Sequence, residues 1–253
     1  MKPMFEGKTV LVTGAATGIG RAIARAAASE GASLVLGDID PQGLARTADA
    51  LRSSCKNLYF AACDVRQQSE LDALVQDGEK AVGPLNTVYA NAGILGSPCD
   101  VWRYDENEFR TVLEVNVLGA WHTLKAVLPG MIERKSGTIV ATASAGGLIG
   151  AAGLSAYCVS KHGVVGLVRT TALEVAALGI RINALCPGMT DTAMLDKVAT
   201  EIPGLREALM TMNPSGRVGT VDEVANAAVW LGSDKSTFVT GHPLVIDGGF
   251  LAQ

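Results

Sequence analysis

The stretch Lys8-Thr9-Val10-Leu11-Val12-Thr13-Gly14-Ala15-Ala16-Thr17-Gly18-Ile19-Gly20 decides the fold of this chain. Its first half is rich in β-branched and apolar residues and predicts a buried strand over residues 8–13. Glycines follow at the spacing G-x-x-x-G-x-G, and an alanine-rich helix then extends to about residue 29. Glycines at such a turn let the backbone approach a pyrophosphate, which the amides and the dipole of the helix N-terminus attract. We therefore expect a strand–turn–helix unit that binds a dinucleotide.

The rest of the chain repeats this alternation of strands and helices. We expect further strands over residues 33–37, 58–62, 87–90, 137–143, 180–185 and 243–246. Helices are expected after Pro41 and over residues 67–82, 106–134, 155–178 and 221–232. Strands that alternate with helices form βαβ units and a parallel sheet with both faces covered. The predicted fold is α/β, a Rossmann-like, doubly wound parallel sheet with helices on both faces.

Composition limits the number of domains and the classes of partner. The chain has 253 residues, of which 48% are hydrophobic and 18% charged, and no linker divides it. We expect a single domain over residues 1–253. The formal net charge of −4 argues against a nucleic-acid surface. The first residues lack the apolar core of a signal peptide and no apolar run reaches membrane-spanning length, which predicts a cytoplasmic protein without a membrane partner.

Cysteines and histidines exclude two further classes. The five cysteines are odd in number, far apart and without a C-x-x-C pair, so neither a disulfide framework nor a zinc site is expected. The three histidines also lack metal-ligand spacing, which leaves no predicted metal site and no histidine-based triad. Cys158 adjoins Tyr157 and is interpreted as a small buried hydrophobe, with redox sensitivity as the alternative.

The end of the second strand carries the prediction about the cofactor. Ligands of parallel α/β sheets bind beyond the carboxyl ends of the strands. Asp38 stands there, 18 residues past Gly20, where a carboxylate accepts hydrogen bonds from an adenosine ribose. The same carboxylate repels a 2′-phosphate, and its neighbours Thr17, Gly37 and Ile39 bring no positive charge. A solvated loop aspartate is the alternative. The pattern predicts NAD rather than NADP.

Other strand ends carry further polar and small residues. Asp64 follows the third strand and is placed to meet the adenine. Asn91-Ala92-Gly93 follows the fourth strand and either supports the sheet or lines the floor of the cofactor cleft. The segment from Pro187 to Thr192 follows the sixth strand, and its backbone and hydroxyls are placed to hold the nicotinamide amide.

Three residues form a predicted proton-transfer site. Ser144 follows the fifth strand, and its hydroxyl is able to bind a substrate oxygen. Tyr157 and Lys161 are spaced i, i+4 on a predicted helix and share one face. A free tyrosine has a pKa near ~10, and making it a base at neutral pH needs roughly 4 kcal/mol of preferential stabilisation of the phenolate. A neighbouring ammonium contributes to that stabilisation. Alone, the pair also fits a tyrosine packed on a lysine stem.

Asn116 is a poor helix former at an interior position of its predicted helix. Three interpretations remain open from the residues alone: it binds water, it distorts the helix, or it is a partly exposed polar residue.

Together these motifs resemble the short-chain dehydrogenase/reductase family, in its branch of about 250 residues. The resemblance covers nearly the whole chain, up to Asp247-Gly248-Gly249. Six motifs occur in the family's order: residues 13–20, Asp64, Asn91-Ala92-Gly93, Asn116, Ser144 with Tyr157 and Lys161, and Pro187-Gly188. Tyr89-Ala90 before Asn91 and threonine at position 17 depart slightly from the family's usual residues.

The resemblance implies catalytic roles for four residues. Tyr157 is the general acid/base, Lys161 lowers its pKa and binds the nicotinamide ribose, and Ser144 holds the substrate oxygen. Asn116 positions a water that links Lys161 to solvent. Hydride transfer is direct and needs no metal. Implied contacts to the cofactor NAD are Gly14, Thr17, Gly18, Ile19, Gly20, Asp38, Asp64, Val65, Asn91, Ala92, Gly93, Tyr157, Lys161, Pro187, Gly188, Thr190 and Thr192.

The predicted activity is NAD(H)-dependent interconversion of a secondary alcohol and a ketone. Expected substrate contacts are Ser144, Ala145, Leu148, Leu154, Tyr157, Met189 and Met194, under a lid of amphipathic helices over residues 190–215. This apolar lining favours a hydrophobic or cyclic small molecule. The alternatives are an NADPH-dependent 3-oxoacyl thioester reductase and a non-catalytic NAD(H)-binding sensor or scaffold.

An oligomer is also predicted. The helix that begins near Tyr157 is apolar on more than one face, and Gly163 and Gly166 permit close approach. The family is usually dimeric or tetrameric, so we expect a homo-oligomer such as a homotetramer.

Overall fold

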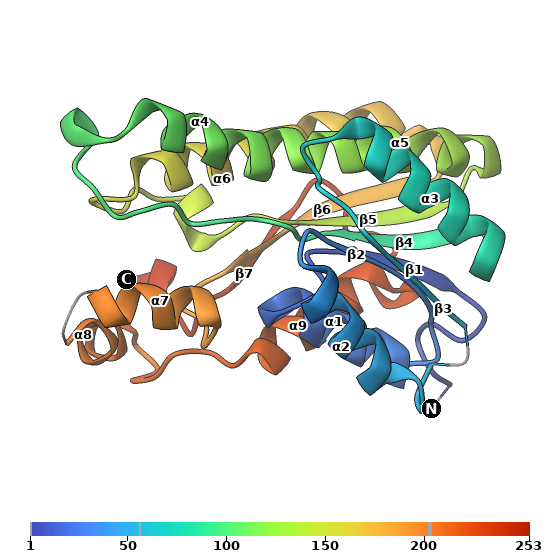
Figure 1. Ribbon diagram of the computed structural model, residues 1–253, viewed down its shortest axis with the longest axis horizontal. Coiled ribbons are helices and arrows are strands. Elements are labelled where there is room, and N and C mark those ends of the chain that lie inside the picture. The colour runs from blue at the N-terminus through green and yellow to red at the C-terminus, as the bar shows by residue number, and fades with distance from the viewer. Residues whose placement is uncertain (1, 56, 202–203) are drawn as a thin grey trace.

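One parallel sheet of seven strands forms the centre of the molecule (Figure 1). The computed structural model describes residues 2–55, 57–201 and 204–253, so residues 202–203 of the expected lid lie outside the described residues. The strands lie in the order β3-β2-β1-β4-β5-β6-β7, and Figure 1 shows helices above and below the sheet. The order reverses between β1 and β4, and such a switch point opens a ligand crevice at the carboxyl ends of the strands. The strands are β1 Thr9–Thr13, β2 Ser33–Asp38, β3 Leu58–Ala62, β4 Leu85–Ala90, β5 Gly137–Thr142, β6 Ile180–Pro187 and β7 Pro243–Ile246.

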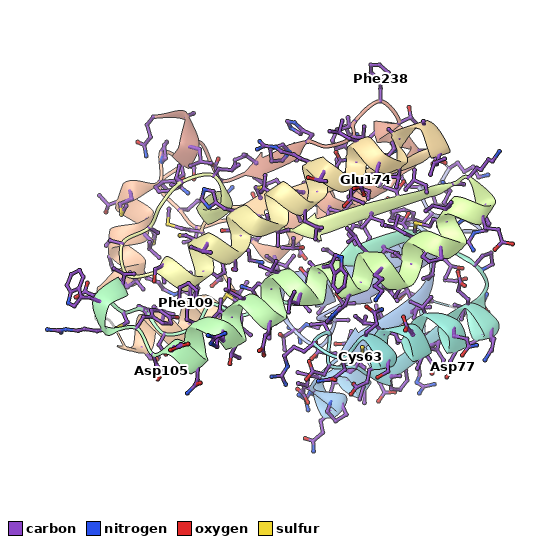
Figure 2. The ribbon with its side chains drawn as sticks, turned by 90° about the horizontal axis from the view of Figure 1, so that it is seen from above. Cys63, Asp77, Asp105, Phe109, Glu174 and Phe238 are labelled. Carbon is purple, nitrogen blue, oxygen red and sulfur yellow. The ribbon has the colours of Figure 1, made fainter. Side chains whose placement is uncertain are left out.

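Helices cover both faces of the sheet, as the alternating pattern predicts. The helices are α1 Gly18–Ser29, α2 Pro41–Leu51, α3 Gln68–Val82, α4 Glu106–Leu113, α5 Gly119–Arg134, α6 Ser155–Val175, α7 Ala193–Glu201, α8 Leu205–Met212 and α9 Val221–Gly232. One core packs α3, α5 and α6 against the sheet, and a second core packs α1, α2 and α9 against the other face. Seen from above, α3, α5 and α6 lie side by side (Figure 2). The doubly wound α/β fold is confirmed.

Local sequence signals explain where several helices begin. Asp40 accepts a hydrogen bond from the Gln42 amide and Pro41 occupies the first turn of α2. Thr220 and Glu223 form a reciprocal capping box at the start of α9. Each of these helices therefore begins at a residue whose side chain satisfies an otherwise free amide.

The expected continuous helix over residues 106–134 is wrong in one respect. A π-helical turn, Glu114–Leu118, separates α4 from α5. Asn116 lies in this turn and is 1% exposed. Its side chain bonds a neighbouring loop, and π turns of this kind often mark functional sites. Of the three interpretations of Asn116, the structure supports distortion of the helix and excludes an exposed polar residue.

Within the part of the chain that the structure describes, no helix combines the length and apolarity needed to cross a bilayer. No group of three or more histidine, cysteine or acidic side chains is arranged to hold a metal ion among these described residues.

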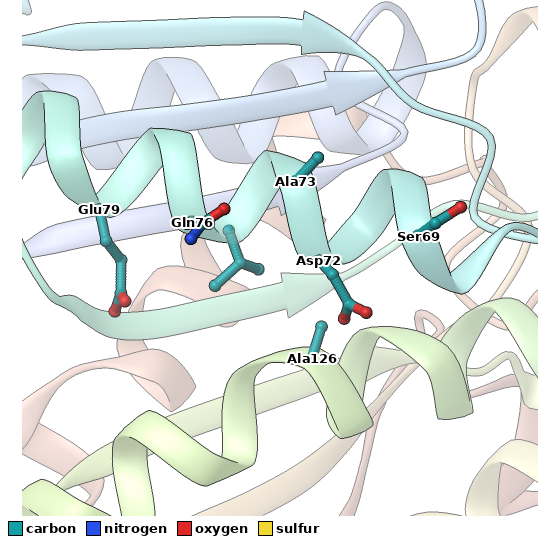
Figure 3. Close-up of a pocket in the computed structure, with 7 residues that line it drawn as sticks. Ser69, Asp72, Ala73, Gln76, Glu79 and Ala126 are labelled. Carbon is teal, nitrogen blue, oxygen red and sulfur yellow. The ribbon is translucent and has the colours of Figure 1, made fainter.

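A polar hollow between α3 and α5, shown in Figure 3, lies over one face of the sheet. Its labelled side chains include Ser69, Asp72, Gln76 and Glu79, and none of them belongs to the predicted site.

Candidate active site

The glycine turn after β1 packs tightly against the end of β4. Gly14 has φ of +68°, and a Cβ placed on it would lie 2.8 Å from the Cα of Ala92. A Cβ on Gly20 would lie 2.0 Å from the carbonyl oxygen of Gly14. Both positions therefore require glycine, because any side chain would push the turn apart. Gly18 also has a positive φ, of +53°.

Asp38 is tied to the glycine turn by its carboxylate. One carboxylate oxygen accepts the Ala16 amide at 2.8 Å, and the other accepts the Asp40 amide at 2.9 Å. An ionised carboxylate has more acceptor sites than these two bonds use. The side chain is half-buried rather than a freely solvated loop residue. The structure thus holds a negative charge at the end of β2, beside the start of α1.

The end of β3 is less open than the sequence predicts. Asp64 accepts a forked pair of hydrogen bonds from Arg66, and this bond is the main cause that lowers the pKa of the carboxyl. Val65 is 6% exposed, and its carbonyl oxygen lies 3.0 Å from Nδ1 of His122 on α5. Neither partner was predicted: Arg66 is two residues from Asp64 in a loop without a regular period, and the contact with His122 depends on how this loop folds over α5.

Asn91 holds three strand ends together. Its side-chain nitrogen donates to the carbonyl oxygens of Thr13 and Gly14, each at 3.3 Å. Its side-chain oxygen accepts from the hydroxyl of Thr142 at 3.0 Å. Thr13 in turn accepts the Asn91 backbone amide through its own hydroxyl oxygen. Of the two roles considered for Asn91, the structure supports the one in which it supports the sheet.

The segment after β6 faces the glycine turn. A Cβ on Gly18 would lie 3.8 Å from Cγ2 of Thr192, an ordinary van der Waals contact, so the two loops lie next to each other. The Gly188 amide donates to Ile246 on β7, and the Thr190 hydroxyl donates to the carbonyl oxygen of Gly188 at 3.0 Å. Pro187 ends β6 and is buried. The two loops predicted to hold opposite ends of a dinucleotide are therefore neighbours.

Ser144, Tyr157 and Lys161 come together at the ends of β5 and β6. The ammonium of Lys161 lies 5.6 Å from the ring centre of Tyr157 and donates to the carbonyl oxygen of Thr142 at 2.8 Å. The Gly146 amide donates to the hydroxyl oxygen of Ser144 at 3.1 Å. A Cβ on Gly146 would lie 3.6 Å from both the Ser144 hydroxyl oxygen and the Tyr157 ring. Sequence reasoning predicted this convergence.

Burial dominates the ionisation of the pair. Desolvation raises the pKa of Tyr157, although a hydrogen bond from Ser144 opposes this rise. Desolvation also lowers the pKa of Lys161 to about 8. The neighbouring lysine was expected to lower the pKa of Tyr157, but the protein alone does not show this lowering. Withdrawal from water disfavours both the charged phenolate of Tyr157 and the charged ammonium of Lys161.

Asn116 lies beside the lysine. Its side-chain oxygen accepts the Ile94 amide, and its side-chain nitrogen donates to the Ile94 carbonyl oxygen, both at 2.8 Å. A Cβ on Gly93 would lie 3.1 Å from that oxygen and 3.2 Å from the ammonium of Lys161. Asn116, Gly93 and Lys161 are thus packed together at the floor of the crevice.

Comparisons with known proteins agree with this geometry. A family model described as enoyl-(acyl carrier protein) reductase matches residues 14–251. The 2,5-dichloro-2,5-cyclohexadiene-1,4-diol dehydrogenase of Sphingobium indicum is 39% identical, with 98% of each chain covered. This chain belongs to the short-chain dehydrogenase/reductase family.

Other members of the short-chain dehydrogenase/reductase family are nearly as similar. The 2-(S)-hydroxypropyl-CoM dehydrogenase 3 of Xanthobacter autotrophicus is 37% identical over the full length of both chains. The crystal structure of levodione reductase matches with a TM-score of 0.95 at 35% identity, covering 98% of this chain and 99% of the other. Membership in the family supports oxidoreduction at a CH–OH group and a nicotinamide dinucleotide as the cofactor.

The residues that we expect to contact the substrate are small or apolar. Leu154 forms a β-bridge with Cys99, which joins the loop after β4 to the start of α6. Ala145 is buried, Leu148 is half-buried and packs on the core, and Met194 on α7 is 39% exposed. Met189 accepts the Gly219 amide through its carbonyl oxygen. The predicted lining residues thus lie on the loops and helices around the crevice.

The expected lid consists of two helices held by an ion pair. Arg206 on α8 donates to Asp191 at 2.7 Å and to Asp196 at 2.5 Å. At the far end of α8, Asn213 is 4% exposed and donates to the carbonyl oxygen of Asp247. The start of α8 is therefore bonded to α7 and to the loop after β6, and the residue after α8 is bonded to the loop after β7.

Sequence reasoning missed three residues that shape the site: Thr13, Thr142 and Ser160. The two threonines end strands, and a hydroxyl residue in that position is the signal that points to them. Ser160 adjoins Lys161 but has no local signal, since its partner lies on another helix.

Proposed function

We propose that this chain is an NAD(H)-dependent dehydrogenase that interconverts a hydrophobic, cyclic secondary alcohol and its ketone. The observation that carries the proposal is the convergence of Ser144, Tyr157 and Lys161. The glycine turn lies in the same crevice and is bonded to the Asp38 carboxylate at the end of β2. Together these groups supply a proton donor, a partner for the substrate oxygen and a place for a dinucleotide.

The residues present fit a nicotinamide dinucleotide. Gly14 and Gly20 have no room for a side chain, and the helix N-terminus that follows them is suited to a pyrophosphate. A Cβ on Gly18 would be in ordinary van der Waals contact with Thr192, so the glycine turn and the loop after β6 border the same crevice. When bound, the nicotinamide ring exchanges a hydride with the substrate and, in its oxidised form, adds a positive charge that favours the phenolate.

The proton steps belong to the protein. In alcohol oxidation, Tyr157 takes the hydroxyl proton, and in ketone reduction it returns that proton. Ser144 is placed to bond the substrate oxygen, because its hydroxyl bonds the Tyr157 phenol and a substrate oxygen beside that phenol would take over this bond. The Gly146 amide occupies one acceptor site of the serine hydroxyl and holds it in place. Lys161 is fixed by the Thr142 carbonyl oxygen, with its ammonium 5.6 Å from the centre of the Tyr157 ring, and a positive charge near the phenol favours its ionised form.

Asp38 supports the preference for NAD over NADP. Its charge stands where an adenosine ribose would bind, and it is anchored by the Ala16 and Asp40 amides rather than free to move away. A 2′-phosphate at this position would face a fixed like charge. Arg66, the nearest cation after β3, is already paired with Asp64.

The lining supports a neutral, apolar substrate. Small and apolar side chains make up the expected contacts: Ala145 follows the catalytic serine and is buried, and Leu148 packs against the core. The names of two relatives describe a cyclohexadiene diol and a hydroxypropyl compound as substrates. These names agree with a secondary alcohol, and the first agrees with a ring.

Turnover with purified protein tests this proposal. Formation of reduced nicotinamide would be followed by its near-ultraviolet absorbance, with NAD⁺ or NADP⁺ and matched panels of alicyclic secondary alcohols and polyols. We expect NAD⁺-dependent oxidation of alicyclic alcohols that is lost in Tyr157→Phe while NADH binding is retained. Faster turnover of polyols would overturn the substrate class, and tight NADH binding without turnover of any alcohol or ketone would favour a sensor.

We also propose a homo-oligomer built on the outer face of α5 and α6. Large apolar side chains are exposed there, among them Trp121 at 43%, Val159 at 53% and Leu173 at 85%. Exposed apolar residues on two adjacent helices favour a covering surface. Sedimentation of a monomer at micromolar concentration would contradict this proposal.

A further inference from the structure

A buried serine between the two catalytic positions of α6 has two polar partners. Ser160 is 0% exposed, and its hydroxyl donates to the carbonyl oxygen of Tyr157 at 2.7 Å. The same oxygen accepts from the side-chain nitrogen of Asn116 at 2.9 Å. The serine therefore joins α6 to the π-helical turn through a bond between two elements that are 44 residues apart in sequence.

This bond completes the hydrogen bonding of the Asn116 amide. Its oxygen is used by the Ile94 amide, and its nitrogen donates once to the Ile94 carbonyl oxygen and once to Ser160. Because a carboxamide nitrogen has two hydrogens, no donor remains. The orientation of the amide is thus fixed by three bonds, of which Ser160 supplies the only one to α6 in this set.

The fixed amide bears on the catalytic lysine. The Asn116 oxygen and the Lys161 ammonium lie 3.1 and 3.2 Å from the same point, the position of a Cβ on Gly93. Lys161 directly follows Ser160, and Tyr157 lies three residues before Ser160. A larger distance between the π-helical turn and α6 would therefore withdraw Asn116 from the Lys161 ammonium. The ammonium would then be free to shift relative to the Tyr157 ring on the same helix.

We propose that Ser160 is a positioning residue, whose hydroxyl holds Asn116 against α6 and so sets the position of Lys161 beside Tyr157. The inference rests on the proposed function for its kinetic test, but it also has a readout independent of turnover. Ser160 itself touches neither substrate nor cofactor in this scheme, since it is enclosed between two helices.

The first test compares Ser160→Ala with Thr171→Ala. Thr171 is a matched control because it lies on the same helix, is 6% exposed and makes a similar back-bond to Leu167, far from the site. We expect kcat to fall about tenfold in Ser160→Ala, with little change in KM, because a buried donor of Asn116 loses its partner. Thr171→Ala should lower the melting temperature without changing kcat.

The pH profile separates positioning from stability. The groups that face the Tyr157 phenol are Ser144, Lys161, Cys158 and Cys186, of which lysine alone favours the phenolate by its charge. Loosening the lysine should move the alkaline rise of alcohol oxidation to higher pH, because the phenol then releases its proton less readily. Ser160→Cys, which keeps a weak acceptor for the Asn116 amide, should lie between wild type and Ser160→Ala.

Two outcomes would overturn the proposal. One is a Ser160→Ala variant that loses stability like Thr171→Ala but keeps the wild-type kcat and pH profile. The other is an additive effect, in which the double variant Ser160→Ala/Asn116→Ala loses more activity than Asn116→Ala alone. Non-additivity is expected, because the serine acts through the asparagine.

A tyrosinate titration distinguishes failure of this inference from failure of the proposed function. The ultraviolet absorbance of tyrosinate would be recorded for wild type and Ser160→Ala, each against its own Tyr157→Phe partner. A higher titration midpoint of Tyr157 in Ser160→Ala supports the positioning role even if no substrate is turned over. Identical midpoints in folded proteins would refute it, whatever the wild-type activity.

Discussion

Replacing Asp38 by asparagine should reverse much of the discrimination against a 2′-phosphate. The substitution removes a charge but keeps a side-chain oxygen that can accept the Ala16 or Asp40 amide, so the glycine turn is expected to persist. Two like charges about 4 Å apart repel by roughly 4 kcal/mol at an effective dielectric constant near 20. Solvent exposure and salt weaken this repulsion at the surface, and we take it as about 2 kcal/mol. This energy corresponds to roughly 30-fold in the ratio of the two dissociation constants.

Calorimetric titration with NADH and NADPH measures this ratio directly. We expect the ratio of the two dissociation constants to shift toward NADPH by about 30-fold in Asp38→Asn, with weaker NADH binding because an uncharged acceptor bonds the ribose less strongly. Asp40→Asn is the control: Asp40 is an exposed neighbour that caps α2, and asparagine caps equally well. An unchanged ratio in Asp38→Asn, or an equal shift in Asp40→Asn, would refute the assignment of Asp38.

Three further predictions concern ionisation, the pocket and a helix cap. Burial lowers the pKa of Lys161 to about 8 from 10.5, so the unfolded chain binds more protons between these values and stability rises with pH through that range. Lys161→Met should therefore raise the free energy of unfolding at pH 7 by up to about 3 kcal/mol, a gain that shrinks above pH 8 in denaturant titrations. Gly146→Ala should fold normally, because its Cβ would make only ordinary contacts, at 3.6 Å, with Ser144 and Tyr157. It should raise KM for bulky cyclic alcohols about tenfold but leave small ones nearly unchanged, and equal effects on both would contradict the pocket assignment. Thr220→Ala removes the capping box of α9 and should cost about 1 kcal/mol in thermal unfolding with unchanged turnover.

Much of the site was predictable because its residues stand at strand ends. The end of a buried parallel strand is visible in sequence, so Asp38, Ser144 and Pro187 could each be assigned to the crevice before any contact was known. The i, i+4 spacing of Tyr157 and Lys161 likewise fixed their common face. These are local rules, and they held.

What was missed depends on contacts between distant segments, on irregular loops or on burial. The π-helical turn results from bonds between Asn116 and Ile94, 22 residues apart, which no local pattern of the helix encodes. The partner of Asp64 was missed because Arg66 is two residues away in a loop without a regular period. The ionisation of Tyr157 was predicted from its lysine neighbour alone, and burial, which sequence does not quantify, proved to be the larger effect.

The amide of Asn91 has a consequence for how this protein loses activity. It joins the end of β1, 77 residues earlier, to the end of β5, 51 residues later, and the latter also anchors Lys161. The chain after β1 and the chain after β5 therefore both depend on the Asn91 side chain for their positions. If the strand ends that Asn91 joins were to separate, the glycine turn and Lys161 would lose their positions in the same event. Partial loss of the Asn91 contacts should thus produce a mixture of fully active and inactive molecules rather than a uniformly slower enzyme.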